Sequence, residues 1–484
     1  MKRISLFRRG QIIIQVIVFG SIAVFMLTAL TNWSLLNSRS SRDTFSREQA
    51  LQVAEAGIDY YRWHLAHAPT DFQDGTGVPG PYFHNFFDKD NNLIGQFSLT
   101  ITPPLLGSTK VTVRSIGTTT LDARVSRSIT AQFAKPSIAK YAVVANNIMR
   151  FGIGTVITGE IHSNQGIRFD GLAQGEVTSA VISYLDPDHQ PLPAEFGVHT
   201  HVAPVDPLPP AAIPPRTDVF AAGRQTGVGV VDFDLITFDL AVMRTAAQAN
   251  GFYRANSGSQ GYHVVLLSSD TFNLFRVTSL VPPPTSQCTN TSPPQPGWGT
   301  WSIQTETLLG NYPMPVNGII FLEDHVFVNG LIDGARVNII AASIPLDPLN
   351  PKNIIVNSDL LYTLNDGSDV IGLIAQGNMN VGMVSQDILR IDAAIIAQNG
   401  RVGRHYYRAP GGSPFSLRCS PYHVRNTLTL WGMIATNKRY GFAYTDGTGY
   451  TTRNIMYDGN LLYEPPPSFP LTSDQYKPIS WEEN

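Results

Sequence analysis

The sequence predicts a mainly β protein that begins with a long N-terminal α-helix, continues into a small antiparallel sheet and then forms a large parallel β-helix, or solenoid. Three observations lead to this fold class. An uncharged apolar run lies near the N-terminus, a short apolar motif recurs later, and charged residues make up 15% of the chain against the usual value of roughly 25%. With 41 Gly and 34 Pro the chain is rich in turns, which favours short strands over a helical bundle.

Composition also excludes several classes of function. The net charge of −3 provides no basic field for DNA or RNA, so no nucleic-acid partner is expected. Two cysteines are too few for a disulfide-dense scaffold or a four-cysteine zinc site. The chain has no phosphate-cradling glycine loop, nucleophile elbow or His-Glu-x-x-His motif, so we expect no cofactor and no catalytic residues.

The first half of the N-terminal helix is apolar. Residues 11–38 contain no charged residue, and residues 12–30 are almost wholly apolar. A helix over residues 12–30 reaches about 28 Å, roughly one hydrocarbon thickness. The basic head that precedes it should stay in the cytoplasm. We therefore expect a single-pass anchor in the cytoplasmic membrane, with the short N-terminus inside and the large domain outside.

A polar, amphipathic helix continues the apolar one to residue 66. Apolar residues recur there at three- and four-residue steps, which places them on one face. Pro69 should end the helix, because proline removes a donor and biases the preceding residue away from helix. The second half should therefore pack on a domain through the stripe formed by Ala50, Ala54, Ile58, Tyr61 and Leu65.

Alternating apolar and polar residues predict an antiparallel β meander within residues 67–136. The clearest runs are residues 96–102, 110–116 and 121–133, separated by segments rich in proline and glycine. We expect three or four strands lying against the end of the helix.

The chain from residue 137 to residue 464 predicts the solenoid. A loose motif of small, apolar, apolar, small and polar residues ending in Asn or Gly recurs at spacings that suit the coils of a parallel β-helix. A β-sandwich remains the alternative, because the repeat is degenerate. The copies are AVVANN at 142–147, GEIHSN at 159–164, GLIAQG at 372–377, AIIAQN at 394–399 and GMIATN at 432–437.

Two proline-rich segments interrupt this pattern. Residues 184–316 hold a proline tract at 203–215, a helical candidate at 239–249 and a second proline-rich loop, so we expect an insertion that projects from the solenoid. Residues 465–484 contain five prolines and no periodicity, and are expected to form an extended tail over the last coil.

The first residues resemble the leader of a type IV prepilin. Arg8, Arg9 and Gly10 are followed by Gln11 and the apolar helix. The resemblance implies that residues 1–10 form a leader that a prepilin peptidase removes after Gly10, and that Gln11 becomes the N-methylated first residue. Further along, Ala54-Glu55-Ala56-Gly57 resembles the signature of PilX-like minor pilins. The likeness is specific over residues 1–66, and residues 67–136 are compatible with it.

One departure bears on the role in a filament. Major pilins usually carry Glu at the fifth mature position, and this chain has Gln15 there. A neutral amide compensates a buried N-terminal amine less well than a carboxylate does. The resemblance therefore implies a minor or tip subunit whose helix anchors the chain before assembly and lies in the filament afterwards. Gly20 would let neighbouring helices approach closely, and Val24 lies in the middle of the apolar run.

The candidate chemical sites are few. Cys288 and Cys419 form either a disulfide outside the cytoplasm or two free thiols. His199 and His201 would share a strand face with His189 nearby, but no spacing motif supplies further ligands. We interpret these histidines as surface residues of a loop, and expect no metal site.

Three functions remain open. The leading hypothesis is a non-enzymatic minor or tip subunit of a type IV pilus or related secretion filament, with other pilin-like subunits as partners. The alternative is a pilin-delivered adhesin on the cell surface that binds a glycan or a protein through the insertion. The least favoured is a membrane-anchored carbohydrate-active enzyme, which would use acid pairs such as Asp232 with Asp234 or Glu323 with Asp324.

Overall fold

The computed structural model describes residues 8–189, 193–233, 240–288, 299–413 and 417–484. The chain divides into two compact units. The helix unit contains the chain up to Pro103 together with Val111–Ala134 and Gln475–Asn484. The solenoid unit contains Pro104–Lys110 and Lys135–Asp474. Residues 1–7, most of the expected leader, lie outside the described residues.

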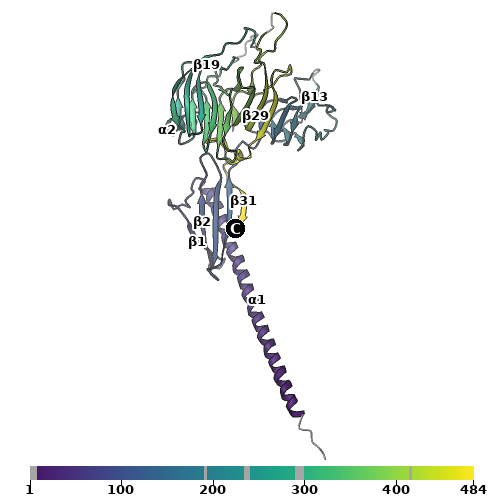
Figure 1. The fold of residues 1–484 in the computed structure, drawn as a ribbon, viewed down its shortest axis with the longest axis vertical. Helices are drawn as coiled ribbons and strands as arrows, with labels where there is room; N and C mark the ends of the chain where they lie inside the picture. Colours follow the sequence, from purple (N-terminus) through teal and green to yellow (C-terminus); the bar gives the residue numbers. More distant parts are fainter. Residues whose placement is uncertain (1–7, 190–192, 234–239, 289–298, 414–416) are drawn as a thin grey trace, which may run out of the picture. The chain divides into compact units, whose positions relative to one another are not determined.

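One continuous helix, α1 (Arg8–His67), dominates the helix unit (Figure 1). The amphipathic stripe expected on its second half is confirmed, because Ala50, Ala54, Ile58, Tyr61 and Leu65 are all buried. Their partners in this core are side chains of the sheet, among them Leu99, Val113, Ile129 and Phe133. The helix ends two residues before Pro69, as proline chemistry dictates.

The sheet of the helix unit is antiparallel and has the order β1-β2-β3-β4-β31. The meander is confirmed, although the segment that joins β2 to β3 belongs mostly to the solenoid unit. The strands are β1 (Tyr82–Phe87), β2 (Leu93–Thr102), β3 (Val111–Thr119), β4 (Ser126–Ala134) and β31 (Lys477–Glu483).

Strand β31 corrects the expectation for residues 465–484. The last residues are not a tail over the final coil, because Lys477 to Glu483 pair antiparallel with β4 in the helix unit. Almost every side chain of β31 is solvent-exposed, with Ile479 partly buried. An exposed edge strand needs no apolar alternation, and Pro478 is tolerated at an edge.

The solenoid unit is built on a 21-stranded sheet of the described residues, nearly all of it parallel. The expected parallel β-helix is therefore confirmed. Its strands are β5 (Val143–Ala145), β7 (Thr155–Thr158), β8 (Ile161–Ser163), β10 (Leu172–Ala173), β11 (Val177–Ser179), β15 (Arg224–Thr226), β16 (Phe252–Arg254), β17 (Tyr262–Leu267), β18 (Thr271–Leu280), β19 (Ile303–Pro313), β20 (Ile319–Leu322), β21 (Val326–Ile332), β22 (Arg336–Ala341), β23 (Ile354–Ile355), β24 (Leu360–Tyr362), β25 (Val370–Ala375), β26 (Met379–Val381), β27 (Ile388–Ala397), β28 (Val402–Arg404), β29 (Val424–Thr436) and β30 (Gly449–Tyr457).

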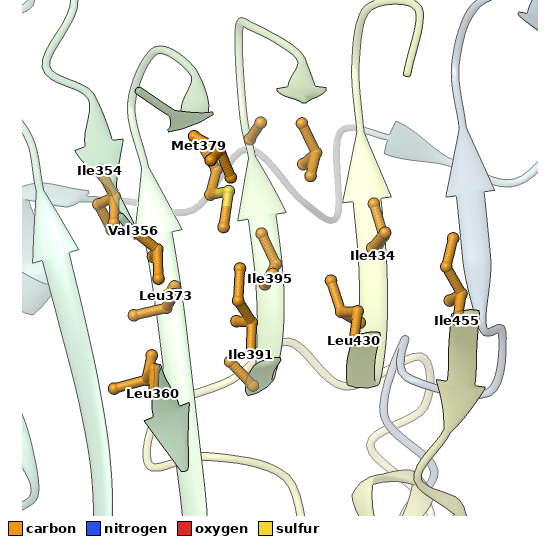
Figure 2. Close-up of a cluster of buried hydrophobic side chains, with 14 of the residues drawn as sticks. Ile354, Val356, Leu360, Leu373, Met379, Ile391, Ile395, Leu430, Ile434 and Ile455 are labelled. Atoms are coloured by element: carbon orange, nitrogen blue, oxygen red, sulfur yellow. The ribbon is translucent and has the colours of Figure 1, made fainter. Parts of the chain in front are cut away.

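Aliphatic side chains stack from coil to coil inside the solenoid (Figure 2). Leu373 pairs with Ile395, and Ile395 pairs with Ile434 on the next strand. A second row runs through Ile391 and Leu430. These residues are fully buried, so each coil covers the apolar interior of its neighbour.

The recurring motif places side-chain amides in register. Gln376, Gln398, Asn437, Asn146 and Asn164 occupy equivalent positions after paired strands. Asn146 Nδ2 donates to Asn437 Oδ1 at 3.0 Å, and Asn164 Nδ2 donates to Asn146 Oδ1 at 3.0 Å. Aligning the motif copies by their sequence letters gives a register that differs from the structure by one residue at some coils. In the structure, for example, Ile434 pairs with Val143.

The coils do not stack in chain order. Strand β5 pairs with β29 and β7 pairs with β30, so the first coils follow the last ones in space (Figure 1). From there the stack continues through β8, β11 and β15 to one end. The chain then re-enters at β16, which pairs with β20 at the other end of the stack.

This path corrects the boundary of the expected insertion at 184–316. Strands β15, β16 and β17 lie within that range and yet pair as solenoid strands. The helix α2 (Leu240–Asn250) forms where a helix is expected and buries Met243 and Ala247. The antiparallel hairpin of β18 and β19 extends the sheet beyond β17. Smaller strands are β6 (Met149–Phe151), β9 (Ile167–Phe169), β12 (Ser183–Leu185), β13 (Ala194–Phe196) and β14 (Val198–His199).

Candidate functional site

The first half of α1 is an uncovered apolar surface. Every residue from 12 to 45 is exposed, and the exposed fractions of Ile12 and Phe25 are 60% and 78%. Among the described residues, α1 is the one helix long and apolar enough to cross a membrane. Soluble monomers rarely leave so large an apolar surface in water, so this half of α1 suits a bilayer or the apolar helices of other subunits.

Three hydroxyls on this half find hydrogen-bond partners within the helix, those of Ser21, Thr28 and Thr31. Ser21 Oγ donates to the carbonyl of Val18 at 2.9 Å. Thr28 Oγ1 donates to the carbonyl of Val24 at 2.9 Å. A dry environment penalises every polar group without a partner, and these hydroxyls bring their own.

The sequence-predicted residues of this half all lie on α1. Gly10 and Gln11 belong to its first turns. Gln15 and Val24 are exposed, and no atom lies within 4 Å of the place where a side chain on Gly20 would begin. The structure therefore brings Gln15, Gly20 and Val24 to one uncovered segment and leaves Gly20 open to close approach by another helix.

The Ala54-Glu55-Ala56-Gly57 signature marks a close contact between α1 and the sheet. A Cβ on Gly57 would lie 2.9 Å from the ring of Phe97. From the other side, a Cβ on Gly117 of β3 would lie 3.0 Å from Cα of Ala54. Small residues on both surfaces let helix and strand approach closely, whereas Glu55 points to solvent.

Glu55 borders a shallow groove in the helix unit, which sequence reasoning did not predict. The groove runs between α1 and β31, and Asp59, Arg62 and Trp481 also line it. The Trp481 side chain is 52% exposed. No sequence signal marked it, because its second wall is the edge strand that the sequence did not reveal.

In the solenoid unit Cys288 and Cys419 form a disulfide that spans 131 residues of sequence. Both cysteines are fully buried and pack with Met383 and Tyr407. The disulfide ties the loop after β18 to the loop before β29.

A pocket of about 370 Å³ opens beside the same loops. Trp301, Asp324, His325 and Lys352 line it, together with polar residues that follow β16. Trp301 is only 8% exposed, and Tyr407 and Tyr440 are also buried.

Of the two acid pairs, Glu323 with Asp324 is the one that the structure describes in full. Asp232 is exposed, and Asp234 lies outside the described residues. Asp324 accepts hydrogen bonds from Ser257 N at 3.0 Å and Ser257 Oγ at 2.6 Å. Glu323 instead binds Arg244 at 3.2 Å, so the two neighbouring carboxylates serve different contacts.

Of the histidines expected on a loop surface, His199 is buried and His189 and His201 are partly buried, which corrects that interpretation. His199 is fully buried, and His201 has a side chain that is 15% exposed. Both lie with His189 in a cluster that includes Asp186 and Glu195. Asp186 follows β12 and Glu195 lies on β13, and these strands pair antiparallel, so a contact between strands supplies what a linear motif did not.

No known protein-family profile matches this chain, and no curated protein matches it either. Among solved structures, the chain is similar to the crystal structure of the competence-associated pilin ComZ from Thermus thermophilus. The two sequences are 13% identical, the match covers 91% of this chain and 97% of that one, and the TM-score is 0.31.

Proposed function

We propose that this chain is a non-enzymatic, low-copy or tip subunit of a type IV pilus or related secretion filament. The observation that carries the proposal is the uncovered apolar half of α1, joined without a break to a half that is packed on its own sheet. Such a helix serves as a membrane anchor first and as a filament helix afterwards, because both environments are dry.

The residues around Gly10 support this role. The basic head and Gly10 precede the apolar helix as in a prepilin leader, and the same head favours a cytoplasmic N-terminus. The partners would be a prepilin peptidase, the membrane and other pilin-like subunits. Gln15 in place of an acid favours a subunit used in few copies.

The test is mass spectrometry of the chain's N-terminus after expression in a host with a prepilin peptidase. The proposal expects a mature chain that begins at Gln11, with or without an added methyl group. Gly10→Val provides the matched control and should leave the leader attached. A wild-type chain that keeps Met1, or that is cut after residue 30, would contradict the proposal.

The pocket beside Trp301 favours a second candidate, an adhesin that binds a surface glycan. Asp324, Lys352 and Gln260 line this pocket together and offer charged and hydrogen-bonding groups of the kind that recognise sugar hydroxyls. Binding on a glycan array that Gln260→Ala abolishes would support this function, since Gln260 lines the pocket and is exposed. An array without any signal would contradict the adhesin function and leave the filament role as the one remaining proposal.

A further inference from the structure

Five side chains that commonly bind metals gather at one place in the solenoid unit, within residues 186–201. Asp186 follows β12, Glu195 lies on β13, and His199 ends β14. His189 and His201 complete the cluster. Asp186, His199 and His201 each offer one atom, and these three atoms lie within 4.8 Å of one another.

The cluster contains buried polar atoms that the protein does not satisfy. Asp186 Oδ2, His199 Nε2 and His201 Nε2 have no hydrogen-bond partner among the described residues. His199 is fully buried and Asp186 is 1% exposed. An unsatisfied buried polar group typically costs about 1–3 kcal/mol, so three converging ones point to a missing common partner.

The spacing suits a metal ion better than an ion pair. His199 Nε2 lies 3.4 Å from Asp186 Oδ2, too far for a good hydrogen bond. Two ligands of a tetrahedral zinc ion, each at about 2.0–2.1 Å from the metal, lie roughly 3.3–3.4 Å apart. The observed separation therefore matches two ligands of one ion.

Hydrogen bonds from neighbouring groups orient these side chains so that their remaining lone pairs can bind a metal ion. His199 Nδ1 donates to the carbonyl of Phe196 at 3.2 Å, which leaves the lone pair on Nε2. Asp186 Oδ1 accepts from Asp188 N at 3.0 Å, which leaves Oδ2 free to bind. The backbone N–H of His201 donates to Asp170 Oδ1 at 2.9 Å and fixes the chain beside the third ligand.

Charge and chemistry select the kind of ion. Glu195 Oε1 lies 3.4 Å from His201 Nε2 and accepts from His189 Nδ1 at 2.6 Å, so it offers a further carboxylate. Imidazole with carboxylate favours Zn²⁺ over Ca²⁺ or Mg²⁺, which prefer oxygen ligands alone.

One cation already lies nearby. Arg168 Nη1 is 3.7 Å from Asp186 Oδ2, but Arg168 Nε binds Asp170 at 2.8 Å. Arg168 is therefore held mainly by Asp170, and it leaves Asp186 Oδ2 without a hydrogen bond.

We propose that Asp186, His199 and His201 bind a structural Zn²⁺ ion, with Glu195 as the nearest additional ligand. The site is nearly closed to solvent, which suits a structural ion rather than a catalytic one. The ion would tie β12, β13 and β14 to the side of the solenoid. The proposal does not depend on the filament role.

The test uses the full-length chain purified in detergent. Metal analysis should find about one Zn²⁺ per chain, removed by chelation and restored by Zn²⁺ alone. Co²⁺ in its place should give the intense visible bands of a tetrahedral site. Asp186→Asn and His201→Gln should each weaken zinc affinity at least about tenfold while circular dichroism shows a folded chain.

His84→Gln is the matched control. His84 Nε2 binds Asp74 at 2.6 Å, so it is a histidine–carboxylate pair with a direct hydrogen bond, and its loss should leave zinc binding unchanged. Equal zinc binding by the wild type and both ligand variants would overturn the proposal, as would a wild type that binds no zinc. In the latter case Asp186 and His199 form an ion pair only.

Discussion

Gly57 of α1 lies so close to Phe97 of β2 that a Cβ on the glycine would be 2.9 Å from the aromatic ring. Real Cβ atoms essentially never approach another atom so closely. The helix and the sheet therefore meet at a distance that only glycine allows. This contact gives the Ala-Glu-Ala-Gly signature a structural reason, because it fixes the packed half of α1 and leaves the other half free.

Gly57→Ala should destabilise the helix unit by about 1–3 kcal/mol, because the added methyl group overpacks the contact. Gly20→Ala is the matched control, since nothing lies within 4 Å of that position. It should be neutral or slightly stabilising, because alanine is the better helix former. Urea unfolding of the detergent-solubilised chain measures both. Equal stability of the two variants would show that the close approach does not matter.

Asn164 lies at one end of the amide ladder, the row of aligned side-chain amides of Gln376, Gln398, Asn437, Asn146 and Asn164. Its amide donates to Val231 O and accepts from Val231 N, both at 2.8 Å. Asn164→Ala should cost about 1–3 kcal/mol, because partly buried backbone groups lose their partners. Asn147→Ala should change stability by less than about 0.5 kcal/mol, since Asn147 is exposed. Thermal unfolding of both variants measures these losses of stability. Equal losses would show that the amide ladder does not stabilise the solenoid.

The amide ladder also shows how much of the fold can be predicted from the sequence. The recurring motif predicted the parallel solenoid, and the apolar stripe on α1 predicted which residues would be buried. The order of the coils did not follow, because parallel pairing joins residues far apart in sequence, such as Val143 and Ile434. A pattern of small and apolar residues also tolerates a shift of one position, so the exact register was lost.

The candidate sites also differ in whether the sequence predicts them. The exposed half of α1 was predictable, since a continuous apolar run has few other interpretations. The histidine cluster was not, because its carboxylates converge only after β12 and β13 pair. Strand β31 was missed because an exposed edge strand carries no hydrophobic alternation. The alternation of His199 and His201 was the one available signal for the cluster.

His325 should make the solenoid unit sensitive to acid. Burial, with Lys352 nearby, lowers the pKa of His325 to about 4, and its Nδ1 accepts from Asn353 N at 3.1 Å. Protonation therefore favours the unfolded chain, whose histidine has a pKa of about 6.5. Above pH ~6.5 His325 is neutral in both states, so its burial does not lower the free energy of unfolding through protonation. That free energy falls as the pH drops from there towards about 4.

The free energy of unfolding measured at pH 7 and pH 5 checks this. His325→Gln should reduce the loss between the two values, whereas His67→Gln, at the exposed end of α1, should not. An unchanged pH dependence in His325→Gln would assign the acid sensitivity to other groups.

Val24→Asp should impair membrane insertion, because a charge in the middle of the apolar run costs about 2.5–3.5 kcal/mol. Val24 is 61% exposed, so the loss has no folding component within the helix unit. Val24→Ala is the control and should insert normally. Alkaline extraction of membranes measures the integrated fraction, and full retention of Val24→Asp would argue against a membrane-spanning role.

The central claim is that this chain joins a filament in few copies. Counting labelled subunits in sheared filaments tests it most directly, with the wild type and Gln15→Glu compared side by side. The account predicts a few wild-type copies per filament and more for Gln15→Glu, because the acid would compensate the buried N-terminal amine along the shaft. Filaments that contain neither form, although both reach the membrane, would contradict it.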